Sequence, residues 1–228
     1  AMLASGRRLD VSVDQPTTIR LAGNWSQGGV FSATGSTVVF NGTGNQNITT
    51  VANFNIVDVD RTGEVGGTQL SALGSLTFAG NLSVTAGTFH LGTAQTHTVT
   101  GTLIVAGGLN LGTSSLSATG NVTVNEGATL TMNANDTNRA VLRNAAAAAS
   151  TVLTINGTLR VLQSGASPLK SRIQSNNGTA GPWYDFTVGN GAGANATWDV
   201  IGLEIANLRD TASVNDGMVF SSDTTFVR

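Results

Sequence analysis

Residues that could support hydrolytic chemistry gather near the C-terminal end of the sequence. Alternation places Trp198 and Val200 on the inner side of a strand and Asp199 on its outer side. The same argument places Glu204 on the outer side of the next strand, so the two carboxylates would line one groove, like the acid and base of a glycoside-cleaving site. The nearby charged residues are Asp185, Arg209 and Asp210. The simpler interpretation is solvation, because the chain must place 13 acidic residues somewhere, and we expect no catalytic residues.

A second candidate site begins at residue 58. Asp58, Asp60 and Thr62 supply oxygen atoms at positions 1, 3 and 5 of a calcium-binding loop, and a glycine follows at position 6. Position 12, which requires a bidentate acid, holds Gln69 instead. The pattern leaves two interpretations, a weak calcium site and a solvated turn after a strand. The missing acid favours the turn, so we expect no bound metal.

The other polar motifs argue against a cofactor. His90 and His97 are the two histidines of the chain, and no carboxylate adjoins either of them, so a metal site there is poorly supported. Residues 189–194 match a glycine-rich dinucleotide-binding pattern, but a strand-like segment follows where that site requires a helix. We therefore expect no cofactor.

Two adjacent aromatic residues, Trp183 and Tyr184, lie in a segment with the composition of a loop. Exposed rings of this kind could stack against a sugar. The alternative is that they pack against Phe186 or close the end of the structure. Both interpretations stay open at this point.

The composition excludes several classes of protein. Charged residues make up 11% of the chain, its formal net charge is -2, and it has no cysteine. The charge lacks the basic surplus of a nucleic-acid-binding protein, and the missing cysteines exclude disulfides and thiolate metal sites. No run of apolar residues reaches the about 18 that a membrane span requires.

A repeating set of short strands must position all of these residues. Similar segments begin at Gly80, Gly101 and Gly120, which are 21 and 19 residues apart, and again at Gly157. A second series keeps the same period at residues 88–91, 108–111 and 129–132, and weaker third strands follow near 98–99 and 116–118. A period of about 20 residues predicts a solenoid.

The apolar residues of both series share one side of the pleat. We expect Leu82, Leu103 and Val122 to stack above one another, and likewise Phe89, Leu109 and Leu130. Because strands in phase with their repeats must pair in parallel, the predicted fold is all-β: a single-stranded parallel β-helix, or β-solenoid, of about 20 residues per coil. We expect one domain over residues 1–228, with an enlarged loop near 133–150.

The N-terminal third carries a different motif. It comprises Asn24-Trp25, Gly29–Phe31, Ser36–Phe40 and Asn41–Ile48. Over residues 24–56 it resembles a repeat of large secreted bacterial surface proteins built from successive β-helix coils, and more loosely the β-helical part of bacterial adhesins. The resemblance implies a right-handed coil and an extracellular or cell-surface location.

These observations favour a non-enzymatic structural protein that assembles head to tail, with itself as its partner, into a fibre or surface layer. The strand-like ends lack an obvious cap, and an unpaired strand edge invites another strand. The assembly residues would be Leu9, Val11, Val13, Val219 and Phe226. The alternatives are an adhesin-type module that binds an extracellular polysaccharide or matrix through Trp183 and Tyr184, and a polysaccharide lyase or hydrolase.

Overall fold

The computed structural model describes the chain in eleven stretches. These are residues 2–3, 8–10, 17–32, 34–49, 52–145, 151–175, 184–188, 197–206, 208–209, 219–220 and 225–227. Side chains are described within residues 17–29, 31, 34–49, 52–145, 151–174 and 199–205. Throughout these stretches the regular secondary structure consists of β-strands, without a helix.

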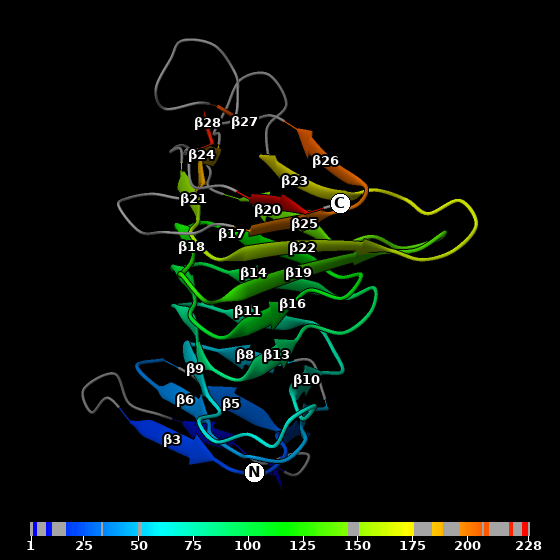
Figure 1. Cartoon of the computed structure of the whole chain (residues 1–228). Helices are drawn as coiled ribbons and strands as arrows, with labels where there is room; N and C mark the ends of the chain where they lie inside the picture. The colour runs from blue at the N-terminus through cyan, green and yellow to red at the C-terminus, as the bar shows by residue number, and fades with distance from the viewer. Residues whose placement is uncertain are drawn as a thin grey trace.

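The strands form three large parallel sheets, which we call sheets 1, 2 and 3 (Figure 1). Sheet 1 contains β3 (Thr18–Leu21), β6 (Thr37–Phe40), β9 (Ile56–Asp60), β12 (Leu82–Ala86), β15 (Leu103–Val105), β18 (Val122–Val124), β21 (Thr151–Ile155), β24 (Tyr184–Val188), β27 (Leu208–Arg209) and β28 (Val219–Phe220). Sheet 2 contains β7 (Gln46–Ile48), β10 (Leu70–Ala72), β13 (Thr88–His90), β16 (Gly108–Asn110), β19 (Thr129–Ala134), β22 (Thr158–Gln163), β25 (Thr197–Val200) and β29 (Thr225–Val227). Sheet 3 contains β8 (Ala52–Phe54), β11 (Leu76–Phe78), β14 (Thr96–Val99), β17 (Ser115–Ala118), β20 (Val141–Asn144), β23 (Ser171–Ser175) and β26 (Leu203–Ala206).

From β6 to β26 the chain visits sheets 1, 2 and 3 in turn, so each strand pairs with the strand three places away. Two short pairs lie at the N-terminal end: β1 (Met2–Leu3) with β4 (Ser26–Gln27), and β2 (Arg8–Asp10) with β5 (Val30–Ser32). All of these strand pairs are parallel, and the arrangement is consistent with a β-solenoid. An all-β parallel fold is thus confirmed.

The predicted stacks are confirmed residue by residue. Leu82 pairs with Leu103, which in turn pairs with Val122 in sheet 1. In sheet 2, Phe89, Leu109 and Leu130 are joined in the same way. All six side chains are at most 1% exposed, because period-2 alternation turns one face of each strand inward.

Aromatic residues fill the core at the N-terminal end. The ring centroid of Trp25 lies 5.1 Å from that of Phe31 and 5.3 Å from that of Phe54, both edge to face. The rings of Phe54 and Phe78 are stacked, with their centroids 6.0 Å apart. Such pairs add about 0.5–1.5 kcal/mol each beyond the burial of their area. The motif that carries the resemblance therefore supplies core residues.

Glycine permits the tight corners between sheets 2 and 3. Gly112 has a φ of +57°, and a Cβ atom at this position would lie 2.0 Å from the carbonyl oxygen of Gly92. No other residue avoids both the strain and the clash.

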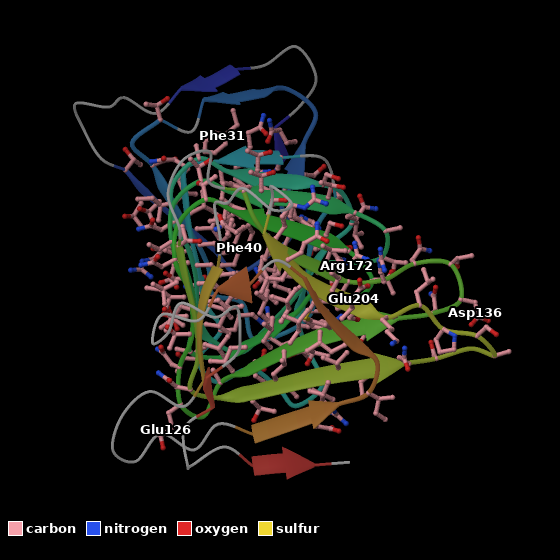
Figure 2. The ribbon with its side chains drawn as sticks, turned by 90° about the horizontal axis from the view of Figure 1, so that it is seen from above. Phe31, Phe40, Glu126, Asp136, Arg172 and Glu204 are labelled. Carbon is pink, nitrogen blue, oxygen red and sulfur yellow. The ribbon has the colours of Figure 1, made fainter. Side chains whose placement is uncertain are left out.

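A lateral extension protrudes from the stack where β19 and β22 run past their neighbours (Figure 1). Its tip is a turn at residues 135–138, in which the Asn135 side-chain oxygen accepts hydrogen bonds from the amides of Thr137 and Asn138. The Asp136 carboxylate accepts hydrogen bonds from the amides of Ala166 and Ser167 and so ties this turn to the following loop (Figure 2). The extension begins within the segment where we expected an enlarged loop, and residues 146–150 of that segment lie outside the described residues.

Candidate functional site

One continuous row of side chains crosses the outer face of sheet 3. The register joins Thr96, Ser115, Val141, Arg172 and Glu204 as successive partners on five neighbouring strands. Their alternation partners, such as Leu116 and Leu142, point into the core and are fully buried. We call this set the outer row.

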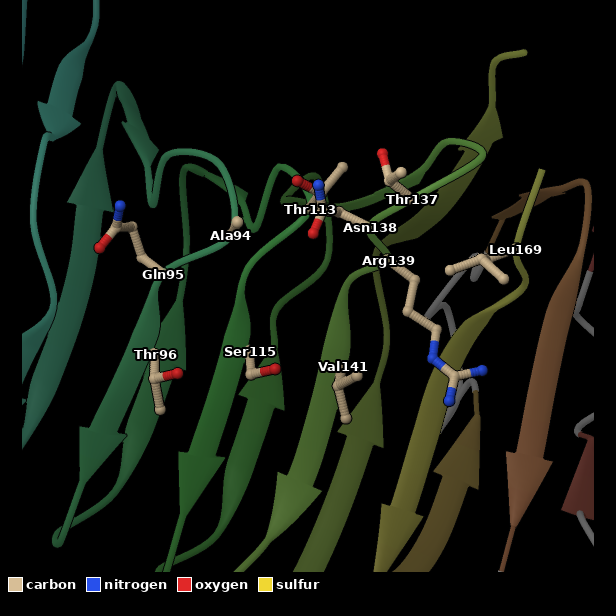
Figure 3. Close-up of a pocket in the computed structure, with 10 residues that line it drawn as sticks. All are labelled: Ala94, Gln95, Thr96, Thr113, Ser115, Thr137, Asn138, Arg139, Val141 and Leu169. Atoms are coloured by element: carbon tan, nitrogen blue, oxygen red, sulfur yellow. The ribbon is translucent and has the colours of Figure 1, made fainter.

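A groove of about 340 Å³ lies over the first part of the outer row, beside the lateral extension. Thr96, Ser115 and Val141 lie in line across three strands at its floor, and Arg139 runs from the turn toward Leu169 (Figure 3). The remaining lining residues are Ala94, Gln95, Thr113, Thr137 and Asn138. Hydroxyl and amide groups dominate the lining, with one guanidinium.

The charged end of the outer row is held together by Arg172. Its guanidinium donates hydrogen bonds to both Glu204 carboxylate oxygens, at 2.7 and 2.8 Å from Nη2 and at 3.0 Å from Nε (Figure 2). This hydrogen bonding holds the pKa of Glu204 below its usual value, and the positive charges of Arg139 and Lys170 act in the same direction. Arg139 contacts the same carboxylate only at 3.5 Å. Arg172 therefore provides most of the hydrogen bonds that the Glu204 carboxylate accepts.

Two local features at the groove each cost the folded protein free energy. Ala94 has a φ of +56° and is the single non-glycine residue with positive φ in the described part of the chain; for an alanine this conformation costs about 1–2 kcal/mol. The Thr113 hydroxyl is buried and lacks a hydrogen-bond partner among the described residues. Strain and unsatisfied polar groups of this kind cluster at functional sites.

The groove is joined to a buried polar cluster beneath it. The amide of Gln95 donates to the Ser114 hydroxyl at 3.0 Å, and that hydroxyl donates to the Leu91 carbonyl at 3.1 Å. His97 is fully buried, accepts a hydrogen bond from the Leu76 amide at Nδ1, and lies 2.8 Å from the same Leu91 carbonyl through Nε2. Since Nδ1 accepts, the proton of the neutral ring sits on Nε2. Burial lowers the pKa of His97 to about 4.

The expected groove between Asp199 and Glu204 is not formed. Asp199 lies on β25 in sheet 2, where it pairs with Arg160 at 3.2 Å, whereas Glu204 lies on β26 in sheet 3. The turn at Ile201 and Gly202 separates the two strands and carries the chain from one sheet to the next, so the carboxylates face outward from different sheets. Asp185 lies on β24 and Arg209 on β27, while Asp210 lies outside the described residues.

The side-chain oxygens of the candidate calcium loop form hydrogen bonds with other side chains of the protein. Asp58 accepts a hydrogen bond from Thr85 at 2.5 Å, and Asp60 accepts one from Thr62 at 2.7 Å. Within the described stretches, no group of three or more His, Asp or Glu side chains is placed to hold a metal ion.

Arg61, between these residues, is a feature that sequence analysis missed. It is fully buried and donates to the Gln46 side-chain oxygen at 2.8 Å, to the Gly44 carbonyl at 2.7 Å and to Glu64 at 3.1 Å. Gln46 in turn donates to the Leu21 carbonyl at 3.0 Å. Continuing the inward alternation of Val57 and Val59 would have indicated it.

His90 and the residues expected to bind sugar or mediate assembly fall partly within the described chain. His90 lies half-buried on the outer face of β13, and its burial lowers its pKa. Tyr184 begins β24 and pairs with Leu208. Leu9 pairs with Phe31, Val219 with Thr187 and Phe226 with Trp198, all within the chain. Val11, Val13 and Trp183 lie outside the described residues.

Comparisons of the chain with protein-family models, curated proteins and solved structures give no match. Among the described residues, no helix is long and apolar enough to span a membrane.

Proposed function

We propose that this chain is a right-handed β-solenoid with a coil of about 20 residues, and that it is a non-enzymatic structural segment of an extracellular fibre or surface layer. The observation that carries the proposal is the stack itself. Three parallel sheets enclose a buried apolar core that continues from Leu21 to Ile173. A stack of this kind can be extended by any further parallel strand in register.

The last strand of sheet 3 is a suitable end for such extension. β26 pairs with β23 on one edge, and its other edge has no strand partner within the described part of the chain. Leu203 and Ile205 on β26 pack against the core but are only partly buried, unlike their fully buried counterparts farther down the stack. A second copy stacked on this edge would cover them, and a contact that does not close into a ring produces a filament.

The charge distribution supports a structural role. Asp199 and Glu204 are each paired with an arginine on a neighbouring strand, which leaves neither as a free acid–base group. A net charge of -2 gives little repulsion between stacked copies. The extracellular setting rests on the resemblance of residues 24–56 to secreted surface proteins.

The test is whether the protein assembles in solution. Sedimentation velocity and negative-stain imaging measure this over a range of protein concentrations. We expect filaments that lengthen with concentration. Leu203→Glu should suppress them, whereas Ile104→Glu should not, because Ile104 is 41% exposed on the lateral face of β15. Thermal unfolding of each variant shows whether the subunit remains folded. A parent protein that stays monomeric at every concentration, or equal loss in both variants, would refute the proposal.

A further inference from the structure

We propose that the groove beside the lateral extension binds an acidic sugar unit of an extracellular polysaccharide, with Arg139 pairing with the sugar carboxylate. This site is separate from the stacking contact of the fibre and from the aromatic pair Trp183 and Tyr184. The inference rests on the lining, charge, shape and local strain of the groove.

The lining suits a sugar. Thr96, Ser115 and Thr137 offer hydroxyl groups, and Gln95 and Asn138 offer amide groups, each able to donate and accept hydrogen bonds. A saccharide presents the same mixture of donors and acceptors around its ring. The apolar side chains of Val141 and Leu169, the latter 38% exposed, give the C–H face of a ring an apolar contact.

The charge favours an anionic sugar. Arg139, Lys170 and Arg172 act on the carboxylate of Glu204. With Asp136 at the tip of the lateral extension counted as well, three positive charges face two carboxylates, which leaves a local surplus of positive charge on a chain whose net charge is -2. Arg172 already makes three hydrogen bonds to that carboxylate, and Arg139 reaches it only at 3.5 Å. The Arg139 guanidinium is therefore available for a bidentate pair with a ligand carboxylate. Nucleic acid fits less well, because it requires cations that follow many phosphates.

The shape favours a polymer. The groove volume of about 340 Å³ is within the usual range for a small ligand, and the outer row continues beyond it across neighbouring strands. Strands in a sheet repeat at about 4.8 Å, which is close to the length of one sugar unit in an extended polysaccharide. Successive units could therefore contact successive strands of sheet 3.

The local strain is consistent with a binding site. Ala94, which lines the groove, has a φ of +56°, and the Thr113 hydroxyl at the same groove lacks a partner among the described residues. Neither feature is required by the core, since glycine would satisfy the backbone at residue 94 and valine would fill the space of Thr113. A ligand bound against this corner would offset the strain at Ala94, whereas the Thr113 hydroxyl is closed to the groove itself.

The experiment is a calorimetric titration of the protein with short oligogalacturonates at low salt. The matched ligand is the methyl ester of the same oligomer, which keeps the sugar and removes the charge. We expect saturable binding of the acid that is weakened about tenfold or more by esterification and by Arg139→Gln. Arg139→Lys should restore part of it. Arg160→Gln, which removes an exposed arginine from sheet 2, should stay within about twofold of the parent.

Three results would overturn the inference: no saturable binding of the oligouronate, equal binding by parent and Arg139→Gln, or dextran sulfate binding as tightly as the uronate, which would indicate simple charge attraction. Arg139 is 31% exposed, so its substitution should leave the fold intact, and an unchanged melting temperature checks this. Filament formation by Arg139→Gln is measured in parallel. We expect Arg139→Gln to lose sugar binding and to form filaments like the parent. The two measurements are independent, so the sugar-binding proposal and the structural proposal can each fail without the other.

Discussion

At the scale of single residues, two of the buried polar side chains, His97 and Arg61, show how this core differs from a purely apolar one. His97 occupies an inward position in sheet 3 next to Leu116 in register, yet its ring satisfies the Leu76 amide and the Leu91 carbonyl. Arg61 similarly connects Gly44, Gln46 and Glu64 across separate coils. Both residues add side-chain hydrogen bonds to the backbone pairing that holds neighbouring coils in register.

Because of His97, we expect stability to fall as the pH is lowered. The folded-state pKa is about 4, below the 6.5 of the unfolded chain, so between these values the unfolded state binds the additional proton. The stability is complete above about pH 6.5 and decreases as the pH falls toward 4, by about 3 kcal/mol in total. Urea unfolding at several pH values measures this.

The control compares two histidine substitutions. His97→Leu should lower stability by about 1–3 kcal/mol at neutral pH, because it leaves the Leu76 amide unpaired, and should flatten the pH dependence between 6.5 and 4. His90→Gln, at a half-buried outer position, should retain most of that dependence. An unchanged pH profile in His97→Leu would contradict this assignment.

Arg61 should be among the residues whose substitution destabilises the chain most. Arg61→Met removes a fully buried guanidinium and leaves Gln46 and the partly exposed Glu64 without their shared partner. Breaking a fully buried pair costs about 3–5 kcal/mol, and we expect a loss toward the lower end of that range because the Glu64 side chain is 23% exposed. Arg160→Met, in an exposed ion pair with Asp199, should cost less than about 1 kcal/mol. Equal losses in denaturant unfolding would show that the Arg61 network contributes little.

At the scale of elements, the corners carry conformational strain that the strands do not. Replacing Ala94 with glycine should stabilise the chain by about 1 kcal/mol, since glycine adopts a positive φ without a steric penalty. Ala106→Gly is the matched control: Ala106 is exposed in a turn and is not among the residues with positive φ, so the added flexibility should be neutral or destabilising. Melting temperatures of the two variants decide the point, and a loss of stability in Ala94→Gly would contradict it.

Much of the strand register follows from the sequence, but the groove does not. The segment after Gly157 is an exception: we expected it to continue the series that begins at Gly80, but β22 lies in sheet 2, where Leu159 pairs with Leu130, because β21 takes the next place in sheet 1. The stack of Leu82, Leu103 and Val122 is readable because period-2 alternation and a period of about 20 residues act together. The groove depends on how the corner near Ala94 and the turn at Thr137 lie against Leu169, and these conformations leave no periodic signal. The separation of Asp199 and Glu204 was missed for the same reason, because the turn between them changes sheets.

At the scale of the whole molecule, the N-terminal segment is where assembly can be tested most directly. We expect deletion of residues 1–14 to give monomers in which the central coils remain folded. Leu9 lies on β2, which pairs with β5 of the same chain, so Val11 and Val13 are the apolar residues of the segment left for a neighbouring copy. Burying each of them there would contribute about 1.5–3 kcal/mol, less the entropy lost on association. Removing the segment should leave the coils between Leu82 and Leu159 unaffected, because their strands pair with one another. Sedimentation velocity measures the association, and far-UV circular dichroism and thermal unfolding measure the fold. If the full chain and the deletion variant sediment as the same monomer at high concentration, head-to-tail assembly is wrong, and the sugar-binding groove becomes the leading account of what the molecule does.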